Sequence, residues 1–390
     1  MSATPTAAPS RRALLTLPFC LIIGSGLAYF IGLAMLNPVF GPYVKDHLGA
    51  GDVAVGVSQG AFAVGAITLR PYAGRIGDRF GRRPLVIGGA AVVAAATAMF
   101  GVVDSFGWFV AMRALAGLGE AAFFVGAATM ITDRAPVEQR GEAISYWSIA
   151  IYGGLALGPM LGEAVLGDEN RYGWCWAISA GAATVALLLG LLTREIDDRP
   201  PPPPHGGKLI HRAALAPGLV LFLGFVSLAG WQGFVKLYAR DDLGVDNVAG
   251  VFTLYGVLIL VIRIVGARLP DRLGARRAGT GALALGAAGM GIVVVWPSIA
   301  GLYVGTAVFA LGQSLAYPAM LVLSLSGVDD SERASVVGTF SSAFDLSMGL
   351  GGLVCGVVAD VFDYRTMFAT CVAFALVGLA YLRTSPSLRR

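Results

Sequence analysis

The segment Gly74-Arg-Ile-Gly-Asp78-Arg79-Phe-Gly81-Arg82-Arg83 joins two apolar stretches, 54–74 and 84–103. A variant of it returns 193 residues later as Gly266-Ala-Arg-Leu-Pro-Asp271-Arg272-Leu-Gly274-Ala-Arg276-Arg277, between the apolar stretches 249–268 and 278–296. About 20 apolar residues are long enough to cross the hydrocarbon core of a bilayer as a helix. The two charged segments are therefore predicted to be loops between membrane spans.

The same criterion predicts spans along the whole chain. They are expected near 14–36, 54–74, 84–103, 108–131, 143–165, 174–193, 215–237, 249–268, 278–296, 299–322, 335–357 and 366–383. Composition agrees, because 56% of the residues are hydrophobic and only 13% are charged. Soluble domains carry about 25% charged residues. We therefore expect an all-α membrane protein with twelve transmembrane helices.

The 193-residue shift relates more than the two loops. It also places Arg70 on Arg263 and Gly158 on Gly351, which predicts two pseudo-symmetric six-helix bundles. Parallel repeats of this kind place a substrate path at their interface, near the middle of the bilayer. Five consecutive prolines form an extended linker between the bundles. The expected division is an N-terminal bundle at 1–193, a cytoplasmic Pro-rich linker at 194–212 and a C-terminal bundle at 213–390.

The distribution of basic residues predicts the orientation. Of the 28 Lys and Arg residues, 20 fall on the side of the linker, 5 on the other side and 3 inside helices. Lys and Arg are enriched in cytoplasmic loops. Both termini are therefore expected in the cytoplasm, with the chain crossing the inner (cytoplasmic) membrane many times. Lys236 is counted among the five residues on the outer side.

Several other classes of protein do not fit. There is no Gly-x-x-x-x-Gly-Lys-Ser/Thr loop for a nucleotide, and the four cysteines have no metal-ligand spacing. The basic clusters are too short for nucleic acid. We expect a transporter and not an enzyme, with no metal and no cofactor. Its expected partners are a small-molecule substrate, a proton and the lipid bilayer, and it is expected to act as a monomer.

The charged loop and its copy resemble the signature loop of the major facilitator superfamily, which has the pattern Gly-x-x-x-Asp-Arg-x-Gly-Arg-Arg. The resemblance covers the whole chain and implies transport by rocking two halves about a central site. In the family the loop Asp is thought to clasp the start of helix eleven and shut the cytoplasmic side. Pro270 and Ala275 depart from the pattern and imply a weaker second latch. The alternative is that these arginines only anchor the loop on the cytoplasmic side. The implied cytoplasmic gate comprises Gly74, Asp78, Arg79, Arg82, Asp271 and Arg272.

The fourth helix holds Arg113 and Glu120, seven residues apart and therefore on one side of the helix, about 10 Å apart along its axis. A similar Arg-led motif in the superfamily is associated with proton movement. Glu120 and Asp345 both fall near the middle of their spans, where a carboxylate is costly unless it is paired, protonated or beside water. We predict that Arg113, Glu120 and Asp345 couple transport to protons. Structural carboxylates bonded to neighbouring helices are the alternative.

The fifth helix carries Gly154, Gly158, Pro159 and Gly162. These residues resemble a motif found mainly in proton-coupled drug antiporters, although Glu163 stands where a second Gly is usual. Small residues four apart allow close helix contact, and proline bends a helix. We predict that they form an outer seal, and the resemblance favours the twelve-helix proton-coupled drug or metabolite efflux group. The alternative is a proton-coupled importer of a sugar or an organic anion.

Other polar and aromatic side chains inside the spans are candidates for the substrate cavity, although each could equally bond to a neighbouring helix. Arg70 and Arg263 are interpreted as structural, reaching the interface or pairing within the bundle. The two midplane carboxylates favour a cationic or polar neutral substrate, unless Arg113 balances one of them. The cavity candidates are Asn37, Tyr152, Gln232, Tyr255, Gln313 and Tyr317.

Overall fold

The computed structural model describes residues 14–102, 105–136, 139–167, 169–195, 210–265, 273–329, 332–385 and 388. Every regular element in these ranges is helical. The helices of the first part of the chain are α1 (Leu17–Ala34), α2 (Asn37–Pro42), the π-helix η2 (Tyr43–His47), α3 (Asp52–Phe80), α4 (Arg82–Met99), the short η3 (Phe100–Val102), α5 (Phe106–Arg134), α6 (Arg140–Leu166) and α7 (Tyr172–Leu192). Those of the second part are α8 (Arg212–Asp241), α9 (Ala249–Val265), α11 (Ala275–Val295), α12 (Ile299–Leu325), α13 (Arg333–Val361) and α14 (Tyr364–Thr384).

The expected membrane spans are present. Eleven helices of the described chain are long and apolar enough to cross a bilayer, the first of them running through α1, α2 and η2. The described part of α9, with 17 residues, is the twelfth. Most helices run past the predicted ends, as α8 does with 30 residues. At a rise of 1.5 Å per residue such a helix exceeds the roughly 30 Å hydrocarbon core, so its polar ends reach the headgroups.

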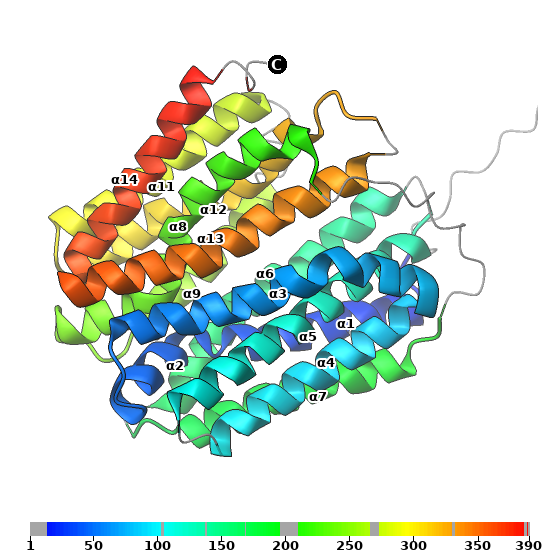
Figure 1. Cartoon of the computed structure of the whole chain (residues 1–390), viewed down its shortest axis with the longest axis horizontal. Helices are drawn as coiled ribbons and strands as arrows, with labels where there is room; N and C mark the ends of the chain where they lie inside the picture. The colour runs from blue at the N-terminus through cyan, green and yellow to red at the C-terminus, as the bar shows by residue number, and fades with distance from the viewer. Residues whose placement is uncertain are drawn as a thin grey trace, which may run out of the picture.

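The helices form two bundles of six spans, which we call the N-terminal half (α1 to α7) and the C-terminal half (α8 to α14). Figure 1 shows α3 and α13 running side by side across the middle of the molecule. Helices α1, α4, α5 and α7 lie on one side of this pair, and α8, α11, α12 and α14 on the other. A second contact between the halves joins α6 to α9. A third contact joins α2 to α8. The boundary between the halves is therefore formed mainly by α3, α6, α9 and α13, with α2 and α8 beside them.

The two signature loops turn at equivalent glycines. Gly81 has a φ of 104° and Gly274 a φ of 81°, a region that side chains with a Cβ rarely adopt. Each glycine directly precedes the next helix, α4 or α11. This backbone requirement explains why the 193-residue shift aligns them. Asp271 and Arg272, and most of the predicted linker, lie outside the described residues.

Glycines allow helix backbones to touch within each half. A Cβ on Gly89 of α4 would lie only 2.6 Å from the carbonyl oxygen of Gly119 on α5. The adjacent Gly88 faces the other way, and a Cβ there would meet no atom within 4 Å. Small residues at such crossings are how membrane helices pack without a hydrophobic driving force.

Gly88 and Gly89 are neighbours with opposite surroundings, so substitutions at the two positions give a matched test of helix packing. We expect Gly89→Ala to destabilise the purified protein by about 1–3 kcal/mol, because the added methyl forces α4 and α5 apart. Gly88→Ala should leave stability unchanged or slightly raised, since the new methyl meets open space. Thermal unfolding in one detergent measures both. Equal midpoints for the two variants would contradict the packing described here.

Candidate functional site

Arg70 of α3 binds two carboxylates from different helices. Its Nη2 lies 2.9 Å from Oε2 of Glu120 on α5, and its Nε lies 2.7 Å from Oδ2 of Asp345 on α13. The three side chains are between 8% and 13% exposed. We call these residues the charged triad. Because α13 belongs to the C-terminal half, the Arg70–Asp345 ion pair joins the two halves near mid-membrane.

The charges of the triad do not balance. One guanidinium faces two carboxylates, so the fully ionised set carries one excess negative charge. An unbalanced charge deep in a membrane protein is costly. Binding one proton would make the triad neutral and would leave one carboxylate to pair with Arg70. The arrangement can therefore hold and release a proton, and each change alters the ion pair between the halves.

Arg70 is the functional candidate that sequence reasoning misses. The sequence favours a structural role for it, whereas the structure places it between the two predicted proton-coupling carboxylates. Arg113 behaves in the opposite way: its Nε donates to the carbonyl oxygen of Ser58 at 3.2 Å. Its guanidinium also lies 4.1 Å from the ring centre of Phe40. The structure thus brings Glu120 and Asp345 together and directs Arg113 elsewhere.

The second intramembrane arginine, Arg263 of α9, meets no carboxylate in the described chain. Its guanidinium carbon lies 3.9 Å from the ring centre of Tyr152 on α6, across the boundary between the halves. The 193-residue shift maps Arg70 on Arg263 and Asp345 on Tyr152. The two arginines thus make equivalent contacts between halves, one with an anion and the other with an aromatic ring.

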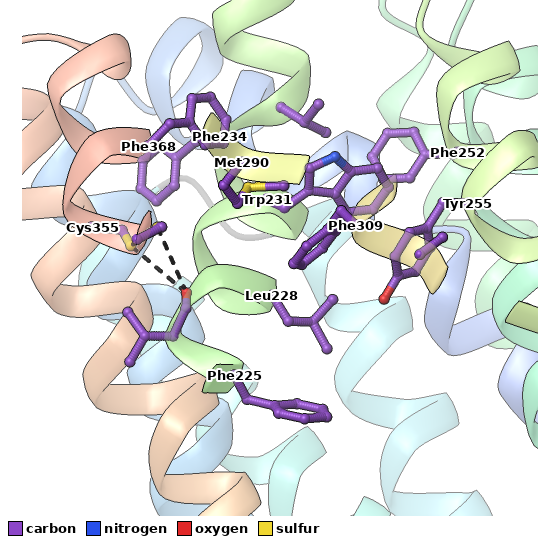
Figure 2. Close-up of a cluster of buried hydrophobic side chains, with 14 of the residues drawn as sticks. Phe225, Leu228, Trp231, Phe234, Phe252, Tyr255, Met290, Phe309, Cys355 and Phe368 are labelled. Atoms are coloured by element: carbon purple, nitrogen blue, oxygen red, sulfur yellow. Dashed lines mark hydrogen bonds between the residues drawn. The ribbon is translucent and has the colours of Figure 1, made fainter. Parts of the chain in front are cut away.

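Tyrosines from the predicted cavity set surround these arginines. Tyr317 lies 3.5 Å from the Ser341 hydroxyl and interacts electrostatically with Arg70, Asp345 and Tyr152. Tyr255 stacks on Trp231, with ring centres 4.3 Å apart. In Figure 2 the Tyr255 hydroxyl lies at the edge of the aromatic cluster and points away from Trp231.

The remaining cavity candidates lie on other helices. Gln313 of α12 is 7% exposed, with its amide nitrogen 3.5 Å from the carbonyl oxygen of Gly224. Its amide oxygen is buried without a hydrogen-bond partner in the described chain. Asn37 and Gln232 are part-buried on α2 and α8, two helices that pack together. Whether any of these residues binds substrate stays a prediction.

One end of the molecule is held shut by polar contacts between the halves, and we call it the closed end. Lys45 of η2 donates to the hydroxyl of Tyr364 at 2.6 Å and lies 3.3 Å from Asp241. The Tyr364 hydroxyl donates to Asp52 at 2.9 Å. Since Tyr364 and Asp241 belong to the C-terminal half, this network spans the boundary.

Two further ion pairs reinforce the closed end. Glu163 of α6 lies 2.6 Å from Nζ of Lys236 on α8, and Arg240 pairs with Asp46. Lys236, which the sequence analysis counts on the outer side, lies within α8 and is only 9% exposed. Glu163 explains that burial, since a buried ammonium group requires a partner.

Backbone contact between the halves extends from the closed end toward the charged triad. A Cβ on Gly56 of α3 would overlap the carbonyl oxygen of Gly352 on α13. On the other side of the boundary, Gly256 of α9 packs equally closely on Ala156 of α6. No side chain could be added at either glycine without moving the helices apart.

The opposite end carries the signature loops, and its described residues make fewer contacts between the halves. A Cβ on Gly74 of α3 or Gly338 of α13 would meet no described atom within 4 Å. The ion pairs found here stay within one half, as for Arg82 with Asp78 at 2.7 Å and with Asp133 at 3.1 Å. We call this the open end.

Four of the six predicted gate residues, Gly74, Asp78, Arg79 and Arg82, are described, and their ion pairs lie within the N-terminal half. Asp78 pairs with Arg82, and the backbone nitrogens of Arg82 and Arg83 donate to Glu195. Arg79 lies over the ring of Phe80.

The glycines of the predicted outer seal pack against α1 of the same half. Gly154 faces Phe30, Gly158 faces Ala34, and Gly162 faces the backbone of Met35. Pro159 lies inside α6 and is buried. The contact of α6 with the other half comes instead from Ala156 and Glu163. The motif thus fixes α6 to α1, and its role as a seal stays a prediction.

A metal centre is not formed by the described residues, which contain no group of three His, Cys, Asp or Glu suited to an ion.

Comparison with known proteins identifies the chain's relatives. The family profile of the Major Facilitator Superfamily matches residues 22–299 and 220–390. An uncharacterized MFS-type transporter of Pseudomonas aeruginosa is 31% identical over 97% of this chain and 95% of its own length.

Solved structures share the fold at low sequence identity. A point mutant of the nucleoside transporter NupG is 14% identical and has a TM-score of 0.78 over 94% of this chain and 99% of its own. A bacterial homologue of the human lysosomal transporter Spinster, in an inward-facing and occupied conformation, is 18% identical with a TM-score of 0.76. That match covers 94% of this chain and 95% of the homologue.

Proposed function

Since the chain belongs to the Major Facilitator Superfamily and is a multi-pass membrane transporter, we propose that it exports a small molecule in exchange for protons. The observation that carries this proposal is the charged triad. A single arginine is shared by two carboxylates, one from its own half and one from the other. Proton binding and the movement of the halves therefore act on the same ion pair.

The coupling step follows from the geometry. When the halves separate at the level of Asp345, the Arg70–Asp345 pair breaks and the freed carboxylate takes up a proton. When the halves close again, Arg70 returns to Asp345 and the proton leaves. Each cycle of alternating access thus carries one proton past the triad. Glu120 keeps Arg70 in place during the exchange.

The orientation completes the proposal. The distribution of Arg and Lys assigns the open end and both termini to the cytoplasm, with the linker 194–212 between the bundles 1–193 and 213–390. With this orientation, the proposal is a monomeric transporter of the inner membrane whose halves are apart on the cytoplasmic side in the present arrangement. In the outward-open arrangement, Asp78 would clasp the start of α13 while the closed end separates.

A sequence motif on α6 supports export as the direction of transport. Its Gly158-Pro159 step resembles the motif of drug antiporters, and the surrounding glycines fix the helix to α1. Import of a sugar or an organic anion uses the same fold and is the alternative direction. Accumulation of substrate in inside-out membrane vesicles, driven by an acidic interior, distinguishes export from import.

A susceptibility screen tests the proton coupling. We expect expression in a pump-deficient host to raise resistance to at least one toxic compound. Glu120→Gln and Asp345→Asn should each lower that resistance to the level of the empty vector, because Asp345→Asn removes the group that exchanges the proton and Glu120→Gln removes the carboxylate that holds Arg70 in place. Glu142→Gln, the same chemical change at an exposed site on α6, should retain it. Full resistance in both triad variants would contradict the coupling proposal.

A further inference from the structure

Arg263 is a cation with no acidic partner among the described residues. It lies about 21 Å along α9 from Ala249, at 1.5 Å per residue, in the last described turn of an otherwise apolar helix. Its Nε is buried without a hydrogen-bond partner, and in the described chain the side chain makes no ion pair. An intramembrane charge is costly and marks a functional site by default.

The internal repeat shows what is missing around Arg263. Its counterpart Arg70 is held by Glu120 and Asp345. The 193-residue shift maps Glu120 on Gln313 and Asp345 on Tyr152. Neutral side chains thus stand where both carboxylates would be. The C-terminal half keeps the cation of the triad and lacks its anions.

The surroundings of Arg263 suit an anion with an aromatic or apolar body. The face of Tyr152 lies against the guanidinium, with 3.9 Å between its ring centre and the guanidinium carbon. Tyr255 precedes Arg263 by eight residues on α9, about two helical turns, so the two residues lie along one stripe of the helix. Its hydroxyl makes no hydrogen bond in the described chain, and its ring continues into the stack with Trp231 and Phe309.

The other charges of the core do not offer an equivalent site. Arg113 donates to the Ser58 carbonyl and lies between the rings of Phe40 and Phe62. Glu120 and Asp345 are both occupied by Arg70. In this arrangement Arg70 engages both midplane carboxylates, while Arg263 has no acidic partner among the described residues. This contrast favours an anionic substrate over the cationic or polar neutral one that the sequence predicts.

We propose that Arg263, with Tyr152 and Tyr255, binds the carboxylate of an organic anion that has an aromatic body. This site rests on the proposed transport function and specifies its substrate class. The guanidinium can hold both carboxylate oxygens, the Tyr255 hydroxyl can donate to one of them, and the aromatic rings contact the body. Because Tyr152 and Arg263 belong to different halves, a ligand bound beside this contact and touching both residues would bridge the halves.

The test measures equilibrium binding, so it does not depend on proton coupling or transport direction. Purified protein in detergent is unfolded thermally with benzoate, 1-naphthoate or indole-3-acetate, each against its own amide at equal concentration. We expect at least one carboxylate to raise the midpoint while its amide does not. Arg263→Gln should weaken that binding by at least about tenfold, the loss of one charge-assisted hydrogen bond of about 1.5 kcal/mol or more. Arg75→Gln, at an exposed site on α3, should bind as the unchanged chain does.

A second measurement uses the unchanged chain, in case Arg263→Gln does not fold. Phenylglyoxal modifies guanidinium groups, and peptide mass spectrometry locates the product. The binding carboxylate should slow modification of Arg263 and leave that of Arg75 unchanged.

The site is overturned if none of the three acids stabilises more than its amide, or if Arg263→Gln binds as tightly as the unchanged chain. The proposed site is also overturned if Arg113→Gln loses carboxylate binding while Arg263→Gln keeps it. If binding follows Arg263 while Glu120→Gln and Asp345→Asn retain resistance, the anion site stands and the coupling proposal fails.

Discussion

Replacing Arg70 with Gln should destabilise the protein by about 3–5 kcal/mol and abolish transport. The change leaves Glu120 and Asp345 buried near each other without their cation. Breaking a buried ion pair by removing one partner has this cost because an uncompensated charge remains. The drop is measured by thermal unfolding in detergent, and transport by the resistance that the unchanged chain confers.

A variant with all three residues of the charged triad neutralised distinguishes the loss of stability from the loss of transport. In Arg70→Gln/Glu120→Gln/Asp345→Asn no unpaired charge remains, and replacement of all members of a buried ionic set is often neutral or stabilising. We expect the triple variant to unfold near the temperature of the unchanged chain and still to confer no resistance. If it were as unstable as Arg70→Gln alone, the cost would come from packing and not from unbalanced charge.

Gly56→Leu should force the closed end apart. Gly56 of α3 already touches the backbone of Gly352 on α13, and no side chain fits between them. The variant should therefore populate the arrangement in which this end is open. Spin labels at Glu169 and Phe362, both exposed at the closed end and in different halves, should move apart by several ångströms. The labels are placed in a chain whose four cysteines are replaced by alanine.

The control for Gly56→Leu is a substitution at Gly60, one helical turn away on α3. A Cβ on Gly60 would make an ordinary contact of 3.6 Å with the carbonyl oxygen of Gly349. Gly60→Ala should therefore leave the label distance unchanged, and Gly56→Ala should give a smaller shift than Gly56→Leu. Equal distances in all three variants would mean that the α3–α13 contact does not hold this end shut.

The architecture could be predicted from the sequence because its determinants are local. Long apolar stretches identify the spans, and the glycines before Arg82 and Ala275 identify the turns through their positive φ. The first span is predicted to end at residue 36, because it is placed by the length of the apolar stretch alone. The structure continues there as α2 and then as the π-helix η2, with Pro38 accommodated in the first turn of α2.

The site depends on contacts between halves, which periodicity cannot supply. A seven-residue spacing places Arg113 and Glu120 on one face of α5, yet Arg113 is drawn to Ser58 and two aromatic rings. The repeat relates positions within each half and says nothing of which residue faces across the boundary. The role of Arg70 therefore becomes visible only with α13 placed beside α3. The signal that could have found it was the intramembrane arginine recurring in each half without an assigned partner.

The closed end depends partly on ion pairs that the external medium can reach. In the Arg240–Asp46 pair the side chains are 25% and 40% exposed, and in the Lys45–Asp241 pair 23% and 31%. At physiological ionic strength the Debye length is about 8 Å, and added electrolyte shortens it further. Exposed pairs are worth roughly 0.2–1 kcal/mol each. Under the proposed orientation, the salinity outside the cell thus tilts the resting balance between the two arrangements, independently of the proton gradient.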